Sequence, residues 1–287
     1  SILTIDPEKV DSDLRFFMQC FREVLEEEGE HTLAQYLPWQ DVSLPPADIK
    51  PSERLAQAYS IAFQLLSMVE QNAAVQRQRL TESEQGLAAM QALWGQCLQQ
   101  LQEREISDRQ IAEALPQMQV ELVLTAHPTE AKRAIVLEHH RRLYLLLVKR
   151  ENQVWTPYEQ HAIREEIKTV LTLLWRTGEI FLQKPDVASE RRNIMHYLYS
   201  VFPEVLPILD LRLRQAWEYC GFDTNLLRSP LCLPRLRLGT WVGGDRDGHP
   251  LVTAEVTCQT LDDLREYALR LLRHHLVDLA HQLSLSD

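Results

Sequence analysis

The sequence predicts a mainly α protein built from long helices, with two short parallel strands. Glycine is scarce, with 9 residues among 287, and apolar side chains recur at the spacing of an amphipathic helix over most of the length. Two short apolar runs break this spacing, and each is followed by a helical pattern. Strand followed by helix is the order found in barrels and doubly wound sheets, where strands run parallel.

The first two helices are each marked by one apolar stripe, beginning at Leu14 in the first and Leu55 in the second. Between them, residues 38–51 contain two adjacent prolines and little periodicity, which predicts a connection rather than a helix. The same spacing predicts helices near residues 53–80, 82–103, 107–115, 129–152, 157–183, 187–220 and 253–285.

The two apolar runs, Val120–Ala126 and Leu236–Val242, are the predicted strands. Both are mostly apolar, which is typical of strands buried on two faces of a parallel sheet. The first ends at a His-Pro pair and the second ends in glycines. Since α/β proteins place their reacting groups at the carboxyl ends of parallel strands, these two ends are the candidate site.

Composition and charge limit the classes of function. The chain is 45% hydrophobic and 25% charged, the balance of a soluble globular protein, and its net charge of −11 argues against nucleic-acid binding. No stretch approaches the roughly 18 to 20 apolar residues of a membrane span, and the first residues lack a signal-peptide pattern. We therefore expect a cytoplasmic protein. The five cysteines never form a CxxC pair, so neither a disulfide framework nor a cysteine metal site is indicated.

The first candidate motif is Thr125–Arg133, where the first strand ends and a helix is expected to begin. The positive end of a helix favours a neutral imidazole and attracts anions, so His127 is suited to accept a proton near an anionic substrate. Lys132 and Arg133, in the first helical turn, would add positive charge and form an anion or effector site. The alternative is a structural His127 that caps the helix or makes a hydrogen bond in the core.

The second candidate motif is Gly239–Pro250, which holds four of the nine glycines within ten positions. In a glycine-poor chain this clustering indicates positive φ angles or a very close approach of the backbone. Arg246 stands between Asp245 and Asp247, an arrangement in which carboxylates hold a guanidinium that faces a phosphate or carboxylate. The alternative is an Arg–Asp network that only locks a tight loop.

Both motifs resemble signatures of the phosphoenolpyruvate carboxylase family. The segment Leu122–Glu130 resembles its histidine signature, and Trp241–Pro250 looks like its second N-terminal signature. A third segment, Leu174–Ile180, is also similar to a family element. The two signatures occur in the family's order, about a hundred residues apart. The resemblance covers nearly the whole chain and is weakest in its first hundred residues.

The resemblance implies a (β/α)8 TIM-type barrel, of which the two strands would be the start. It implies an N-terminal helical region over residues 1–117 and the first part of the barrel over residues 118–287. Family members are roughly three times longer than this chain, so the remainder of the barrel is expected outside it. The parent protein would be an allosteric homotetramer.

The family's magnesium-dependent reaction joins bicarbonate to phosphoenolpyruvate and gives oxaloacetate and phosphate, through carboxyphosphate and the pyruvate enolate. The resemblance assigns His127 the role of general base, which takes the carboxyphosphate proton. It implies Mg²⁺ as cofactor, with ligands outside this chain, so the chain alone is expected to be inactive. The active-site wall would comprise Trp241, Gly243, Gly244, Asp245, Arg246 and Asp247.

Some positions depart from the family pattern. Lys132 and Arg133 match a basic pair that binds a sugar-phosphate activator in some members, but the first is lysine here, which cannot bind phosphate with two parallel hydrogen bonds. His249 replaces the usual asparagine. An alternative function is a non-catalytic paralogue that binds an anionic metabolite or a protein partner through Lys132, Arg133 and Arg246.

Overall fold

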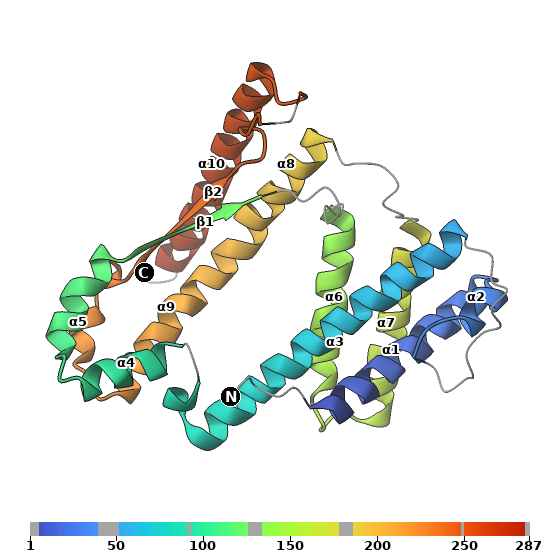
Figure 1. The fold of residues 1–287 in the computed structure, drawn as a ribbon, viewed down its shortest axis with the longest axis horizontal. Helices are drawn as coiled ribbons and strands as arrows, with labels where there is room; N and C mark the ends of the chain where they lie inside the picture. The colour runs from blue at the N-terminus through green and yellow to red at the C-terminus, as the bar shows by residue number, and fades with distance from the viewer. Residues whose placement is uncertain are drawn as a thin grey trace. The chain divides into compact units, whose positions relative to one another are not determined.

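The chain is mainly helical with two parallel strands, as predicted (Figure 1). The computed structural model describes residues 6–39, 52–90, 93–125, 134–177, 186–247 and 250–284. The chain forms two compact units. The first unit comprises residues 1–84 and 135–182, and the second comprises residues 85–134 and 183–287.

The first unit is entirely helical among its described residues. Its first helix begins where the Asp6 side chain accepts a hydrogen bond from the Glu8 amide at 3.0 Å, with proline at the first helical position. The helices of this unit are α1 (Pro7–Glu27), α2 (His31–Gln35), α3 (Glu53–Gln85), α6 (Ala134–Arg150) and α7 (Pro157–Thr177).

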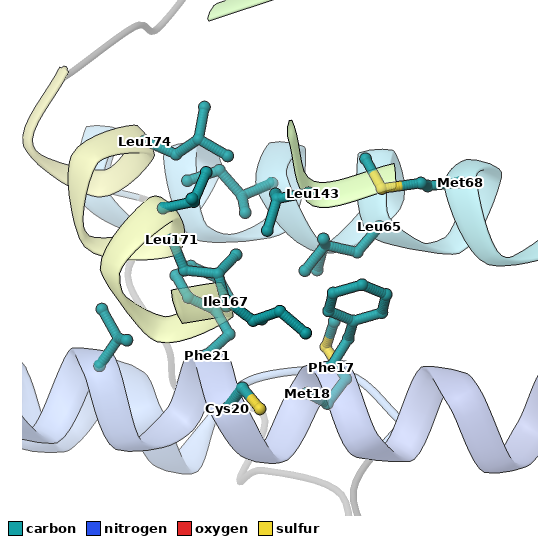
Figure 2. Close-up of a cluster of buried hydrophobic side chains, with 14 of the residues drawn as sticks. Phe17, Met18, Cys20, Phe21, Leu65, Met68, Leu143, Ile167, Leu171 and Leu174 are labelled. Carbon is teal, nitrogen blue, oxygen red and sulfur yellow. The ribbon is translucent and has the colours of Figure 1, made fainter. Parts of the chain in front are cut away.

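One apolar core joins the four long helices of the first unit (Figure 2). Phe17 and Phe21 of α1 point into it and are fully buried, together with Leu65 of α3, Leu143 of α6 and Ile167 of α7. This burial explains the apolar stripe that marks each helix in the sequence, because each stripe is the face that the helix turns to the core. Burial also raises the pKa of the Cys20 thiol to about 11.

Ion pairs border this core between α1 and α7. Both terminal nitrogens of Arg164 donate to the Glu23 carboxylate, at 2.7 and 2.6 Å, and this pair lowers the pKa of Glu23. Lys168 donates to Glu27 at 2.6 Å, which raises the pKa of Lys168. The ion pairs and the apolar contacts both join α1 to α7, so these two helices pack against each other in one defined register.

The second unit has its own core around Trp217, which is fully buried and whose indole N–H donates to the Asp223 carbonyl at 2.9 Å. Leu98 and Ile111 pack into the same cluster. Figure 1 shows α8 and α9 following one another, joined by the π-helical segment Tyr197–Val201. The helices of this unit are α4 (Trp94–Glu103), α5 (Asp108–Ala114), α8 (Val187–His196), α9 (Phe202–Tyr219) and α10 (Ala254–Ser284).

The strands β1 (Gln119–Leu124) and β2 (Arg235–Thr240) pair in parallel, in register from their first residues to their last. The prediction that both are buried on two faces was wrong, since Val120 is 50% exposed and Val123 is 44% exposed. An apolar run predicts that a strand is buried, but it does not predict which part of the protein buries it. Among the described residues, no third strand joins this sheet.

One helix boundary also differs from the prediction. A single helix, α3, covers the expected helix at 53–80 and the start of the one at 82–103. Gly86 follows with a φ of +84°, and a β-carbon there would lie 2.6 Å from the Tyr219 hydroxyl. The chain turns at the residue where only glycine fits, and α4 begins at Trp94.

The other expected helices are present. Those near 107–115, 187–220 and 253–285 correspond to α5, to α8 with α9, and to α10. The helices expected at 129–152 and 157–183 correspond to α6 and α7. Residues 129–133, residues 178–183 and most of the expected connection at 38–51 lie outside the described residues.

Two findings bear on the wider predictions. No helix in the described part of the chain is both long enough and apolar enough to cross a membrane. The predicted division into residues 1–117 and 118–287 concerns the domains of a larger protein and stays a prediction.

Candidate functional site

The strands that lead into the two candidate motifs end side by side. Leu124 is the register partner of Thr240, and one residue later the Trp241 amide donates to the Leu124 carbonyl at 3.1 Å. The parallel ladder therefore continues into the second motif and ties the backbone of Trp241 to the end of β1. Thr125, the first residue of the first motif, is exposed beside this junction.

A tight backbone turn follows β2. The Trp241 carbonyl accepts hydrogen bonds from the Gly244 amide at 3.0 Å and from the Asp245 amide at 2.9 Å. The Val242 amide donates to the Thr240 hydroxyl at 3.0 Å, and the Asp247 amide donates to the Asp245 carboxylate at 3.0 Å. These bonds satisfy successive amides locally, so Trp241–Asp247 forms one defined turn, called here the β2 turn.

Glycine is required at one position of the β2 turn. Gly243 has a φ of +76°, and a β-carbon there would overlap the hydroxyl of Thr260 and lie 2.9 Å from its β-carbon. Both features predicted from the glycine clustering, positive φ and close approach, occur together at this residue. At Gly244 the nearest such atom is 3.8 Å away, so space alone does not demand glycine there.

The polar side chains of the β2 turn face solvent. Asp245, Arg246 and Asp247 are all exposed, and Trp241 is 59% exposed. Within the described ranges, no carboxylate forms an ion pair with Arg246. An Arg–Asp network therefore does not lock this part of the turn, which is held by its backbone hydrogen bonds and by Thr260.

Several predicted site residues lie outside the described residues. They include His127, which follows Leu124 by three positions in the sequence, and the basic pair Lys132 and Arg133. Gly248 and His249 also lie outside. The structure brings together the strand ends and the β2 turn, and the roles of these other residues stay predictions.

The described residues offer no metal centre. Among them, no group of three or more histidine, cysteine, aspartate or glutamate side chains could hold a metal ion. The two acidic residues of the β2 turn, Asp245 and Asp247, are exposed, and Asp245 already accepts a backbone hydrogen bond. These residues do not fit Mg²⁺, which prefers several oxygen ligands in a near-octahedral arrangement.

The segment Trp175–Arg176 lines a cleft in the first unit, with a volume of about 450 Å³. Its arginines are already engaged: Arg176 donates to Glu28 at 2.7 Å, and Arg54 lies 3.5 Å from Glu30 and 5.1 Å from the Trp175 ring centroid. Since each guanidinium has its own carboxylate, the cleft lacks the open positive charge of an anion site.

Sequence reasoning did not identify Thr260 as part of the site. The residue lies on α10, in a pattern that reads as an ordinary amphipathic helix. Its contact with Gly243 joins positions far apart in the chain and leaves no local signal. The contact is seen only in the structure, where the β2 turn packs against α10.

Comparison with known proteins gives a consistent result. A family model described as phosphoenolpyruvate carboxylase matches residues 25–287. A protein of that name from Methylorubrum extorquens is 36% identical over 238 residues, which is 82% of this chain and 25% of the relative. A protein of the same name from Xanthomonas campestris pv. campestris is 31% identical over 270 residues, which is 91% of this chain and 29% of the relative.

A third relative with the same name, from Gloeobacter violaceus, is 32% identical over 257 residues and is matched over 26% of its length. The chain thus spans about a quarter of the length of the curated relatives it matches. Both candidate motifs fall within the matched residues of the family model.

Proposed function

Because the chain belongs to the phosphoenolpyruvate carboxylase family, we propose that the ends of β1 and β2 form one wall of a carboxylase active site. The reaction joins bicarbonate to phosphoenolpyruvate and gives oxaloacetate and phosphate. One observation supports the proposal: the hydrogen bond from the Trp241 amide to the Leu124 carbonyl, at 3.1 Å, joins the described start of the first signature to the start of the second at one sheet edge. Carboxyl ends of parallel strands are where such folds perform chemistry.

In this proposal His127 is the general base. It follows Leu124, the last residue of β1, by three positions in the sequence. Its imidazole takes the proton of carboxyphosphate, whose C–O bond to phosphate then breaks to release carbon dioxide and phosphate. The enolate carbon attacks carbon dioxide and forms the new carbon–carbon bond of oxaloacetate. A histidine is suited to this step because its ordinary pKa lies near neutrality.

The β2 turn supplies the positively charged side chain of Arg246 and one wall of the site. The exposed guanidinium of Arg246 can donate two parallel hydrogen bonds to a phosphate or carboxylate oxygen pair. The indole of Trp241, also exposed, provides an apolar surface on the same turn. Glycines at 243 and 244 let the backbone fold tightly enough to present both side chains from one turn.

Replacing Arg246 by alanine in the full-length protein is expected to raise the KM for phosphoenolpyruvate or bicarbonate about tenfold or more. The reason is that a hydrogen bond to a charged group contributes about 1.5 to 3 kcal/mol. Steady-state kinetics of oxaloacetate formation measure this effect. Arg228→Ala removes another exposed arginine of the second unit and is the matched control. Equal kinetics for the Arg246 and Arg228 variants would refute the role of Arg246.

The chain is proposed to need the remainder of the barrel for turnover. The family resemblance places the Mg²⁺ ligands and most phosphate-binding arginines outside this chain. Val120 and Leu122, exposed on β1, form apolar surface that further barrel strands and helices would cover. Oxaloacetate formation by the isolated chain would contradict this part of the proposal.

The parent protein is proposed to be a cytoplasmic, allosteric homotetramer, with Lys132 and Arg133 as an anion or effector site. A second candidate function is a non-catalytic protein that binds an anionic metabolite or a partner protein. The open guanidinium of Arg246 favours it, since such a group binds anions with or without catalysis. A carboxylase assay of the full-length protein separates the two, because only the first predicts bicarbonate-dependent oxaloacetate formation.

A further inference from the structure

We propose that Thr260 is a positioning residue, which sets the β2 turn and so the placement of Trp241 and Arg246; the inference rests on the proposed function of that turn. Thr260 lies on α10, and it is 4% exposed. It is the only buried residue in the whole of α10. A single buried polar side chain on a helix whose other residues are exposed or half-buried marks the point where that helix is covered most completely.

The covering element is the β2 turn. The Thr260 hydroxyl donates to the Val256 carbonyl at 2.7 Å, one helical turn earlier, which fixes its rotamer. The hydroxyl oxygen and the methyl group then face Gly243, where an added β-carbon would overlap the oxygen and lie 3.0 Å from the methyl carbon. The backbone of the turn therefore rests directly on the Thr260 side chain.

The helix that carries Thr260, α10, is held in place by contacts with neighbouring elements. Three residues further along α10, Asp263 forms an ion pair with Arg191 of α8 at 2.6 Å. One turn beyond, the Tyr267 ring packs edge-on against Tyr199, with ring centroids 5.6 Å apart. These contacts fix α10 against α8 and the π-helical segment. The β2 turn therefore packs against a helix whose position is fixed.

Movement of Gly243 would be passed on to the proposed site residues. The amides of Gly244 and Asp245, directly after Gly243, both donate to the Trp241 carbonyl. If Gly243 leaves Thr260, these two hydrogen bonds must lengthen or break, and Arg246 moves with the chain that follows them. Thr260 thus acts through the turn and does not need to touch a substrate.

The test is a double-mutant cycle in the full-length protein with Thr260→Ala, Gly243→Ala and the combined variant. Hydrogen exchange of the peptide containing Gly244 and Asp245 reports the turn, and steady-state kinetics report the site. Each single variant is expected to speed exchange of these amides about tenfold and to raise the KM for phosphoenolpyruvate about fivefold, with kcat changed less than about twofold. The combined variant should be no worse than Gly243→Ala alone, because Thr260→Ala removes the hydroxyl oxygen and the methyl carbon that the new methyl group meets and leaves only the β-carbon at 2.9 Å.

Two controls make the result specific. Thr257 is on the same helix and its hydroxyl also donates to a carbonyl four residues earlier, at 3.1 Å from Thr253, so Thr257→Ala removes the same kind of bond away from the turn. Thr260→Ser keeps the hydroxyl. Both should stay within about twofold of wild type in exchange and KM.

The inference is overturned if Thr260→Ala leaves exchange and KM unchanged, if Thr257→Ala has the same effect, or if the two single effects multiply in the combined variant. Its failure is distinct from failure of the proposed function. A protein without carboxylase activity would refute the function, while the exchange measurements would still test whether Thr260 sets the turn.

Discussion

The His127→Ala variant of the full-length protein is expected to form oxaloacetate about 100-fold more slowly than wild type, or more slowly still. A positioned general base contributes typically about 10² to 10⁴ in rate, and alanine leaves no group in that position to accept the carboxyphosphate proton. Phosphoenolpyruvate should still bind, because Arg246 and the rest of the site remain. The expected loss therefore falls on kcat and can be measured by coupling oxaloacetate to a dehydrogenase.

The comparison needs a histidine with no proposed role. His161, exposed on α7, provides it, and His161→Ala should retain wild-type kcat. Unchanged thermal unfolding of the His127 variant would separate loss of a base from loss of the fold. Turnover of His127→Ala at the wild-type rate would remove the general-base assignment and favour the structural alternative.

The second large effect is on stability. Phe21→Ala is expected to lower the free energy of unfolding of the first unit by about 3 to 5 kcal/mol, the usual range for emptying a buried phenylalanine site. Phe21 is fully buried in the core that joins α1, α3, α6 and α7, and its ring packs edge-on against Trp175 with centroids 6.2 Å apart. Surrounding helices cannot collapse easily into a space bordered on all sides by other core residues.

Urea titration followed by tryptophan fluorescence measures this change, since Trp175 lies in the same core. Tyr158→Ala is the control, because Tyr158 is 89% exposed in the same unit and should change stability by less than about 0.5 kcal/mol. A loss below about 1 kcal/mol for Phe21→Ala would mean that this core is not packed as described.

The presence of the helices could be predicted because a helix that buries one face has apolar residues at a regular spacing in the sequence. The stripe that begins at Leu14 faces the core of the first unit, and α1 follows it closely. The boundary near Gly86 could not be predicted from periodicity, because it depends on positive φ and on the nearby Tyr219 hydroxyl. Gly86 is itself a local signal for the end of a helix, but the apolar periodicity does not record it.

For the strands, the sequence predicted the positions but not the burial. Their existence followed from apolar runs, and both lie within two residues of the predicted positions. Their predicted burial was wrong because Val120 and Leu122 have no covering layer among the described residues. The apolar composition of a strand reflects the elements that pack against it, and those elements can belong to another part of the fold.

For the candidate site, the sequence predicted two strands whose carboxyl ends lead into the motifs, but not the side chain that supports the β2 turn. The order of strand, motif and helix placed both motifs at strand ends, and the Trp241 amide bond to Leu124 shows that these ends meet. The glycine clustering correctly indicated a constrained backbone, which is Gly243. Thr260 was not foreseen, since its role depends on a contact that no local pattern records.

The central claim is that the two motifs form one active site at the ends of β1 and β2. It is tested most directly by kcat/KM for oxaloacetate formation in the His127→Ala, Arg246→Ala and double variants of the full-length protein. Groups that act as a unit are non-additive, so the double variant should lose less than the product of the two single losses. A loss equal to the product of the two single losses, the behaviour of distant independent residues, would contradict the claim.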